Sequence, residues 1–322
     1  MAGRSGTVTH MRMRQLGNSG LTVSIIGLGA NNFGWRLDVE KSRPVIEEAI
    51  ESGINFIDTS DSYDTGNSET ILGEVLKGRR EDVVIATKFG SNMGGSNGPD
   101  WGARASRRYV HRAVEASLRR LQTDWIDLYQ LHRLDGVTPH EETLDALDDL
   151  VRQGKIRYAG SSNFPAWHAT EADWISKTRG ITRYVSAQNH YSLLERTIEL
   201  DLIPTCIAHG ISVIPYFPLA NGLLTGKWKR GDAAPEGSRL SGRNAPSDQA
   251  FDVIEGLTSL AEQAGITLTE LALAGLAAQP AVGSVIAGAT SAEQVRSNAA
   301  AGDIELSPDV LAEVDRIALA LR

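Results

Sequence analysis

The amino-acid sequence predicts an α/β protein with a parallel (β/α)8 barrel of the TIM type, because short apolar segments alternate with amphipathic segments along the chain. Several apolar segments are nearly continuous hydrophobic runs, which is typical of parallel strands covered on both faces. The competing architecture is a doubly wound open sheet, which binds dinucleotides through a G-x-G-x-x-G turn. Only a partial match, IGLGANNFG at 26–34, follows a predicted strand, and no helix begins directly behind it.

Eight strands and eight helices are predicted in strict alternation. The strands are expected at 23–28, 54–58, 82–88, 125–132, 156–160, 184–188, 211–216 and 283–288. The helices are expected at 40–52, 68–77, 106–121, 140–152, 166–179, 197–209, 252–264 and 293–301. Val110 and Val114 show the helical spacing of one apolar face, and Gly53 and Gly154 are suitable C-terminal stops for the helices before them.

The N-terminal part of the chain lies outside this alternation. Residues 1–10 are expected to be a loose leader. Residues 11–25 read as a β-hairpin turned at 18–20, which in a barrel would plug the bottom. Because no linker and no low-complexity segment interrupts residues 11–322, we expect them to form a single barrel domain.

The composition excludes several classes of function. A net charge of −8 argues against a nucleic-acid-binding protein, whereas local lysines, arginines and helix N-termini still permit an anionic small ligand. Cys206 is the only cysteine, so neither an internal disulfide nor a cysteine-based zinc site can form, which fits a reducing compartment. The sequence contains neither a signal peptide nor an apolar run of the roughly 20 residues that cross a membrane. We therefore expect a soluble, cytoplasmic protein with no nucleic-acid or membrane partner.

Polar side chains follow several predicted strands, at the end where the active sites of barrels lie. Asp58, Lys88 and His132 end three consecutive strands, and Tyr63 stands in the loop after Asp58. A lysine cation favours the phenolate form of a nearby tyrosine, so Lys88 would make Tyr63 a stronger acid. Asp58 would hold Lys88 charged, and His132 would hydrogen-bond a substrate oxygen or relay a proton. Such a group has no nucleophile and no metal cage, so it implies a hydride cofactor and a carbonyl substrate whose oxygen takes a proton from Tyr63.

The segment DTSDSYDTGNSE at 58–69 has a rival interpretation as a calcium loop. Its twelfth residue is the glutamate that an EF-hand requires, but its sixth is Tyr63, where the sharp turn needs glycine. The calcium interpretation therefore fails, and we expect no metal site. Asp61 and Asp64 are expected to be solvated loop charges, and Ser68 is expected to cap the following helix.

These residues belong to a series of motifs that resembles the aldo-keto reductase family from about Met11 to the C-terminus. The motifs are DTSDSY followed by GNSE, then ATK, QLH, GSSNF, AQNHYS, YFPLANGLLTGK and IAGATSAEQVRSN. The branch is similar to bacterial members and to potassium-channel β subunits. The resemblance implies an NADP-dependent oxidoreductase of the alcohol dehydrogenase or carbonyl reductase type, which reduces an aldehyde or ketone to an alcohol. It also implies a catalytic tetrad of Asp58, Tyr63, Lys88 and His132, with Tyr63 as general acid and Lys88 lowering its pKa.

The resemblance further implies where the cofactor binds. Ser162, Asn163 and Gln188 would hold the nicotinamide carboxamide, and Tyr216 would stack on the nicotinamide ring. The other implied contacts are Gly29, Ala30, Asp58, Phe217, Pro218, Leu219, Ala220, Gly222, Lys227, Arg239, Gly288, Thr290, Gln294 and Asn298. The backbone of residues 218–222, together with Lys227, would cradle the pyrophosphate, and the last four residues would bind the adenosine end near a helix N-terminus. Gly288, Thr290 and Gln294 are neutral, whereas many family members carry a basic residue in the segment equivalent to 288–294 that binds the 2′-phosphate. Similar branches still take NADP, so NADPH is expected and NADH stays possible.

Phe33, Trp35, Trp101 and Tyr191 stand in strand-end loops and are expected to line a pocket for an apolar carbonyl compound.

One rival function for the chain is a Schiff-base aldolase that uses Lys88 as its nucleophile. The other is a regulatory subunit that binds a nicotinamide cofactor with little turnover, since channel β subunits share the scaffold.

Overall fold

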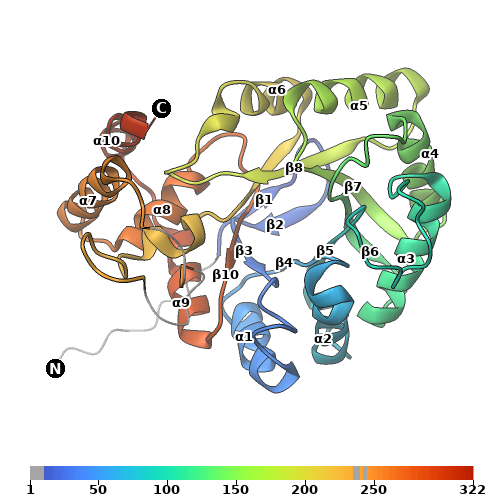
Figure 1. The fold of residues 1–322 in the computed structure, drawn as a ribbon, viewed down its shortest axis with the longest axis horizontal. Helices are drawn as coiled ribbons and strands as arrows, with labels where there is room; N and C mark the ends of the chain where they lie inside the picture. Colours follow the sequence, from blue (N-terminus) through green and yellow to red (C-terminus); the bar gives the residue numbers. More distant parts are fainter. Residues whose placement is uncertain (1–10, 235–239, 242–244, 322) are drawn as a thin grey trace.

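The computed structural model describes residues 11–234, 240–241 and 245–321. Its ten strands form an antiparallel pair, β1-β2, and an eight-stranded parallel sheet in the order β10-β3-β4-β5-β6-β7-β8-β9 (Figure 1). The strands are β1 Met13–Gln15, β2 Thr22–Ser24, β3 Ile26–Gly29, β4 Phe56–Asp58, β5 Val84–Phe89, β6 Ile126–Leu131, β7 Ile156–Ser162, β8 Tyr184–His190, β9 Ser212–Tyr216 and β10 Val285–Gly288. From β3 to β9, strands that are consecutive along the chain are neighbours in the large sheet, which is the strand order of a (β/α)8 barrel.

The two end strands of the parallel sheet come together to close the barrel. The amide of Val213 in β9 donates to Ala281 O at 2.7 Å, and the amide of Gly283 donates to Val213 O at 2.9 Å. Ala281 and Gly283 lie just before β10, so these bonds bring the last strand of the sheet beside the first. The predicted (β/α)8 barrel is confirmed, and the doubly wound sheet is excluded.

Helices surround the sheet, as Figure 1 shows. They are α1 Val39–Glu51, α2 Asn67–Val75, α3 Arg107–Leu121, α4 His140–Arg152, α5 Ala166–Arg179, α6 Leu202–His209, α7 Asp248–Gln263, α8 Leu268–Ala277, α9 Ala292–Ala300 and α10 Pro308–Ala318. Eight of them correspond to predicted helices, although the one expected at 197–209 is split into the 3-10 turn η3 Thr197–Glu199 and α6. Gly53 and Gly154 have φ of 80° and 73°, as expected of residues that end a helix.

Helices α8 and α10 were not predicted. In α8 eight of ten residues are buried, so the helix is apolar nearly all round and has no polar face to reveal its period. Its N-terminal end is marked instead by a capping box, in which Thr267 and Glu270 satisfy each other's backbone amides. Helix α10 has a strong apolar stripe, but it follows the last predicted barrel helix and lies outside the alternating pattern.

The N-terminal hairpin lies against the barrel interior. Leu16, Leu21 and Val23 pack in one buried cluster with Phe56 of β4 and with side chains of β5, β6, β9 and β10. These barrel side chains include residues near the N-terminal ends of their strands, so the hairpin closes the bottom of the barrel. The open end of the barrel is therefore the one that carries the strand C-termini.

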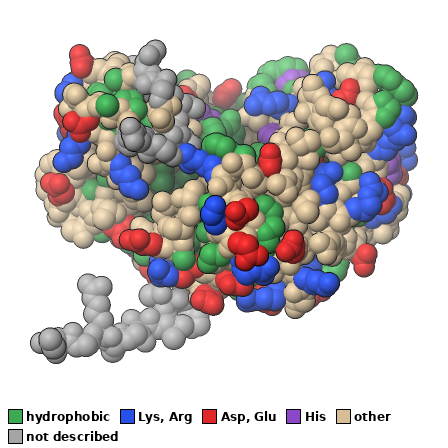
Figure 2. Space-filling view, turned by 60° about the horizontal axis from the view of Figure 1, so that its bottom comes forward, with side chains coloured by type: hydrophobic (Ala, Val, Ile, Leu, Met, Phe, Trp, Pro, Cys, Tyr) green, Lys and Arg blue, Asp and Glu red, His purple; other side chains and the backbone are tan. Residues whose placement is uncertain are grey.

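The surface has a mixed charge pattern. On the face shown in Figure 2, acidic and basic side chains lie interspersed and do not gather into a patch of one sign. Within the described residues, no helix combines the length and the apolar character needed to cross a membrane.

Candidate active site

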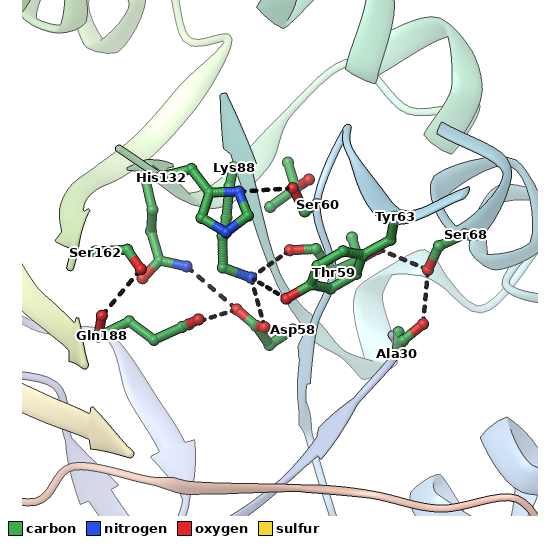
Figure 3. A network of polar contacts seen from close by, with 12 residues as sticks. Ala30, Asp58, Thr59, Ser60, Tyr63, Ser68, Lys88, His132, Ser162 and Gln188 are labelled. Carbon is green, nitrogen blue, oxygen red and sulfur yellow. Dashed lines mark hydrogen bonds and ion pairs between the residues drawn. The ribbon is translucent and has the colours of Figure 1, made fainter. Parts of the chain in front are cut away.

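A buried ion pair lies at the C-terminal ends of β4 and β5. Nζ of Lys88 lies 2.6 Å from Oδ2 of Asp58, and it also donates to Thr59 O at 2.6 Å (Figure 3). The exposed fractions of Lys88 and Asp58 are 0% and 1%, so both charges are withdrawn from water. A buried charge must be paired, and here each partner satisfies the other.

The second oxygen of the Asp58 carboxylate is held as firmly as the first. Gln130 donates to Oδ1 from Nε2 at 3.2 Å, and Gln188 donates to it from Nε2 at 2.7 Å. Gln130 was not predicted as a site residue. Its signal is the strand alternation in WIDLYQLH, because Gln130 stands two positions before His132 and therefore on the same side of the strand.

Tyr63 begins the 3-10 turn η1, Tyr63–Gly66, which follows β4. Its hydroxyl lies 3.3 Å from Lys88 Nζ, and that ammonium also lies 4.9 Å from the centre of the Tyr63 ring. Burial by itself lowers the pKa of Lys88, but the charge of Asp58 and the interaction with Tyr63 outweigh it and raise that pKa above the usual lysine value. Lys88 is therefore a permanent cation against the phenol oxygen.

His132 lies directly after β6 and faces Tyr63, with the two ring centres 6.2 Å apart. Its Nδ1 is 3.1 Å from the hydroxyls of both Ser60 and Ser91. Burial, together with the cations Lys88 and Arg133, lowers the pKa of His132 to about 3. The ring is therefore neutral at physiological pH and offers one nitrogen to the serine hydroxyls, which leaves the other for a ligand.

The DTSDSYDTGNSE segment departs from expectation at two positions. Asp61 is fully buried, and Asn97 donates to its Oδ2 at 2.9 Å, so the prediction of a solvated loop charge was wrong there. Burial and the nearby Glu69 raise the pKa of Asp61 to about 8. Ser68 is not the helix cap, because Gly66 occupies that position and the Ser68 hydroxyl donates to Ala30 O at 2.9 Å. Asp64 is exposed, as predicted.

A cavity of about 770 Å³ opens above these residues, within the usual range for a ligand pocket. Three of the four residues predicted to form a tetrad, Asp58, Tyr63 and His132, line it, whereas Lys88 lies behind them. The predicted cofactor residues in its wall are Gly29, Ser162, Asn163, Gln188, Tyr216, Phe217, Pro218, Leu219, Gly222, Lys227, Gly288, Thr290, Gln294 and Asn298. The wall does not include Ala30 or Ala220, which are buried. Arg239 lies outside the described residues.

The middle of the cavity is built from hydrogen-bonded polar side chains. Ser162 donates from Oγ to Gln188 O at 2.9 Å, and Asn163 donates from Nδ2 to His132 O at 3.0 Å. Tyr216 donates to Asn163 Oδ1 at 2.8 Å and stacks on His190, with ring centres 5.4 Å apart. Asn163 has φ of 59°, a left-handed conformation that functional sites often contain.

Beyond the polar middle, the cavity wall includes Lys227 and the first turn of α9. Ser291 caps this helix by accepting from the Gln294 amide, and Thr290 donates its amide to Gln294 Oε1 at 2.8 Å. The wall also contains two arginines that were not predicted, Arg36 and Arg133. Arg133 carried a signal, because it directly follows the strand-end residue His132.

The four aromatic residues predicted for the substrate pocket are not in the cavity wall. Phe33 and Tyr191 are 0% and 1% exposed and belong to the hydrophobic core, where Tyr191 donates its hydroxyl to Glu199 at 2.6 Å. Trp35 and Trp101 are mostly exposed. Their position in strand-end loops was correct, but the direction of each side chain depends on packing partners far away in the sequence.

The comparisons with known proteins agree on one protein family. The profile described as "Aldo/keto reductase family" matches residues 25–319. The chain is 37% identical to "Uncharacterized oxidoreductase YrpG" of Bacillus subtilis (strain 168), with 94% of each chain covered. It is 35% identical to "Versiconal hemiacetal acetate reductase" of Aspergillus parasiticus, over 93% of this chain and 94% of the relative. It is 34% identical to "Probable voltage-gated potassium channel subunit beta" of Arabidopsis thaliana, over 95% and 96%.

Proposed function

This chain belongs to the aldo/keto reductase family of oxidoreductases, and on that basis we propose that it reduces an aldehyde or ketone to an alcohol with NADPH. Members of the family act on small carbonyl compounds and generally use nicotinamide cofactors. The observation that carries the proposal is the position of Tyr63, which lines the cavity while the buried Lys88 cation lies 3.3 Å from its hydroxyl.

In the proposed reaction, Tyr63 donates its proton to the carbonyl oxygen of the substrate as negative charge develops there. Lys88 stabilises the phenolate that remains, and Asp58 keeps Lys88 charged and oriented. His132 is neutral, so it can donate a hydrogen bond to the same substrate oxygen without adding a second charge. General acid catalysis of this kind contributes roughly 10²–10⁴-fold to a rate.

The cavity wall supports a nicotinamide cofactor. When bound, NADPH supplies the hydride. Ser162, Asn163 and Gln188 provide the amide and hydroxyl groups that suit a carboxamide, and Tyr216 provides a flat ring beside them. Lys227 and the N-terminus of α9 provide positive charge for phosphates. A cofactor laid along this wall would bring its nicotinamide to Tyr63 and His132.

The preference for NADPH over NADH rests on the chain's similarity to branches that use NADP. The wall near α9 contains Thr290, Gln294 and Asn298 in place of a basic residue, while Arg36 and Lys227 supply cations elsewhere along the cavity. Our proposal is therefore NADPH as preferred cofactor, with NADH accepted more weakly.

A single domain over residues 11–322 and a cytoplasmic location also stay predictions.

Two alternative functions are possible for a barrel of this kind. A Schiff-base aldolase needs a neutral lysine that reaches the substrate, but Lys88 is 0% exposed and its pKa is raised by Asp58 and Tyr63. A regulatory subunit receives some support from relatives named as potassium channel subunits.

One experiment separates these functions. The full chain is incubated with a panel of aldehydes and ketones, with NADPH and NADH in parallel, and absorbance of the reduced cofactor is followed. We expect many cofactor molecules to be oxidised per protein chain, faster with NADPH. Tight cofactor binding with fewer than one turnover would favour the regulatory subunit. Borohydride trapping of a substrate on Lys88, without cofactor binding, would favour the aldolase.

A further inference from the structure

A cluster of three potential metal ligands lies outside the cavity, on two neighbouring helices. His140 is the first residue of α4, and His168 and Glu171 lie three positions apart on α5, so they share one face of that helix. Figure 1 shows α4 and α5 side by side on the outside of the barrel. The ligand atoms of these three side chains all lie within 4.8 Å of one another.

The distances within the cluster approach those of a tetrahedral site. His140 Nε2 lies 3.6 Å from Glu171 Oε2, and His168 Nδ1 lies 3.7 Å from the same oxygen. Metal–ligand bonds of about 2.0–2.2 Å at tetrahedral angles separate two ligand atoms by about 3.3–3.6 Å. The two nitrogens are closer, at 2.7 Å, because the rings hydrogen-bond each other. A metal ion that replaced this hydrogen bond would need them to part by only about 0.6 Å.

The two imidazoles are held in place by their neighbours. The ring of His140 is 8% exposed and lies 5.5 Å from the ring of Phe164, centre to centre. The ring of His168 stacks on Trp167 at 3.4 Å. Glu171 is half exposed, which leaves a path for an ion and a place for a water ligand.

We propose that His140, His168 and Glu171 form a binding site for a divalent transition-metal ion of the Zn²⁺ class. Two imidazoles and one carboxylate suit Zn²⁺ and its neighbours Co²⁺, Ni²⁺ and Cu²⁺, whereas Ca²⁺ and Mg²⁺ prefer sites built of oxygen. The site is separate from the proposed reductase centre, since none of its three residues lines that cavity. The proposal is independent of the proposed function.

The test is Zn²⁺ titration by calorimetry on the full, tag-free chain. We expect one Zn²⁺ per chain at this site, and no comparable heat from Mg²⁺. His168→Gln and Glu171→Gln should each weaken binding by more than the roughly 10–100-fold that changes around a metal's ligands typically cost. The matched control is His111→Gln, a histidine on α3 whose imidazole lies beside Asp149 at 3.7 Å. Its Zn²⁺ affinity should equal that of the wild-type chain.

A second readout uses Trp167, which stacks on His168. Ni²⁺ or Cu²⁺ bound at His168 should quench part of the tryptophan fluorescence, and Trp167→Phe should remove most of that quenching while Zn²⁺ affinity is retained. His140→Gln is a poor test of metal binding, because His140 is buried and its replacement can disturb folding. Absence of saturable Zn²⁺ binding in the wild-type chain, or equal binding by the folded His168→Gln and Glu171→Gln variants, would overturn the proposal.

Discussion

The ammonium of Lys88 lies 3.3 Å from the hydroxyl of Tyr63, and only Tyr63 of this pair lines the cavity. The lysine is fully buried, so a ligand in the cavity meets the phenol and not the amine. In the proposed reaction, Lys88 therefore acts on the substrate through Tyr63. The arrangement separates the group that gives up a proton from the charge that makes the proton easy to lose.

The first prediction concerns this phenol. Tyr63→Phe removes the acidic hydroxyl and keeps the ring, so we expect kcat for aldehyde reduction to fall by about 10²–10⁴-fold. NADPH affinity, measured by quenching of tryptophan fluorescence, should change little. The matched control is Tyr184→Phe, because the Tyr184 hydroxyl is buried away from the site and, among the described residues, no group hydrogen-bonds to it. Wild-type turnover by Tyr63→Phe would exclude Tyr63 as the general acid.

The second prediction concerns the ion pair of Asp58 and Lys88. Asp58→Asn or Lys88→Met alone leaves the other charge buried without its partner, so we expect each to lower the free energy of unfolding by about 3–5 kcal/mol. The double variant removes both charges, and it should be more stable than the sum of the single effects predicts while staying inactive. Urea unfolding of the cofactor-free chain and its three variants measures the coupling. Purely additive losses would contradict the buried pair.

The third prediction follows from the pKa of Asp61, which is raised to about 8 in the folded chain against 3.8 in the unfolded one. Stability contributed by the protonated carboxyl is therefore complete below pH 3.8 and is lost as the pH rises through 8. Asp61→Asn keeps an acceptor for Asn97 and does not titrate. Its stability relative to wild type should grow by about 1.4 kcal/mol per pH unit between pH 5 and 8, then level off.

Urea unfolding of both chains at several pH values from 5 to 9 gives this difference directly, because the titrations of all other groups are common to both. A difference that is the same at pH 5 and pH 8 would show that Asp61 is already ionised in the folded chain.

The fourth prediction concerns cofactor binding at Lys227, which lies in the cavity wall. Lys227→Gln removes a cation that is proposed to meet the pyrophosphate, so Kd should rise about tenfold for both NADPH and NADH. The control is Lys229→Gln, since Lys229 is exposed and not in the wall. An effect on NADPH alone would instead place Lys227 at the 2′-phosphate.

Local patterns were sufficient for much of the fold. The alternation of apolar strands with amphipathic helices predicted the barrel, and the ends of these strands pointed to Asp58, Lys88 and His132 before their contacts were known. Both inferences work because strand direction and periodicity are properties of short segments. Helix α8 escaped prediction for the same reason, since a helix buried nearly all round has no periodic face.

The sequence by itself determined the barrel, its bottom hairpin and the residue types at the open end, because backbone geometry translates local spacing into direction. Only the tertiary structure decided which of these side chains face the cavity. It buried Asp61 beside Asn97, withdrew Phe33 into the core and placed His140 against His168. Each of these outcomes depends on a contact between segments far apart in the chain, and packing and the satisfaction of buried polar groups select such contacts only when the whole molecule has folded.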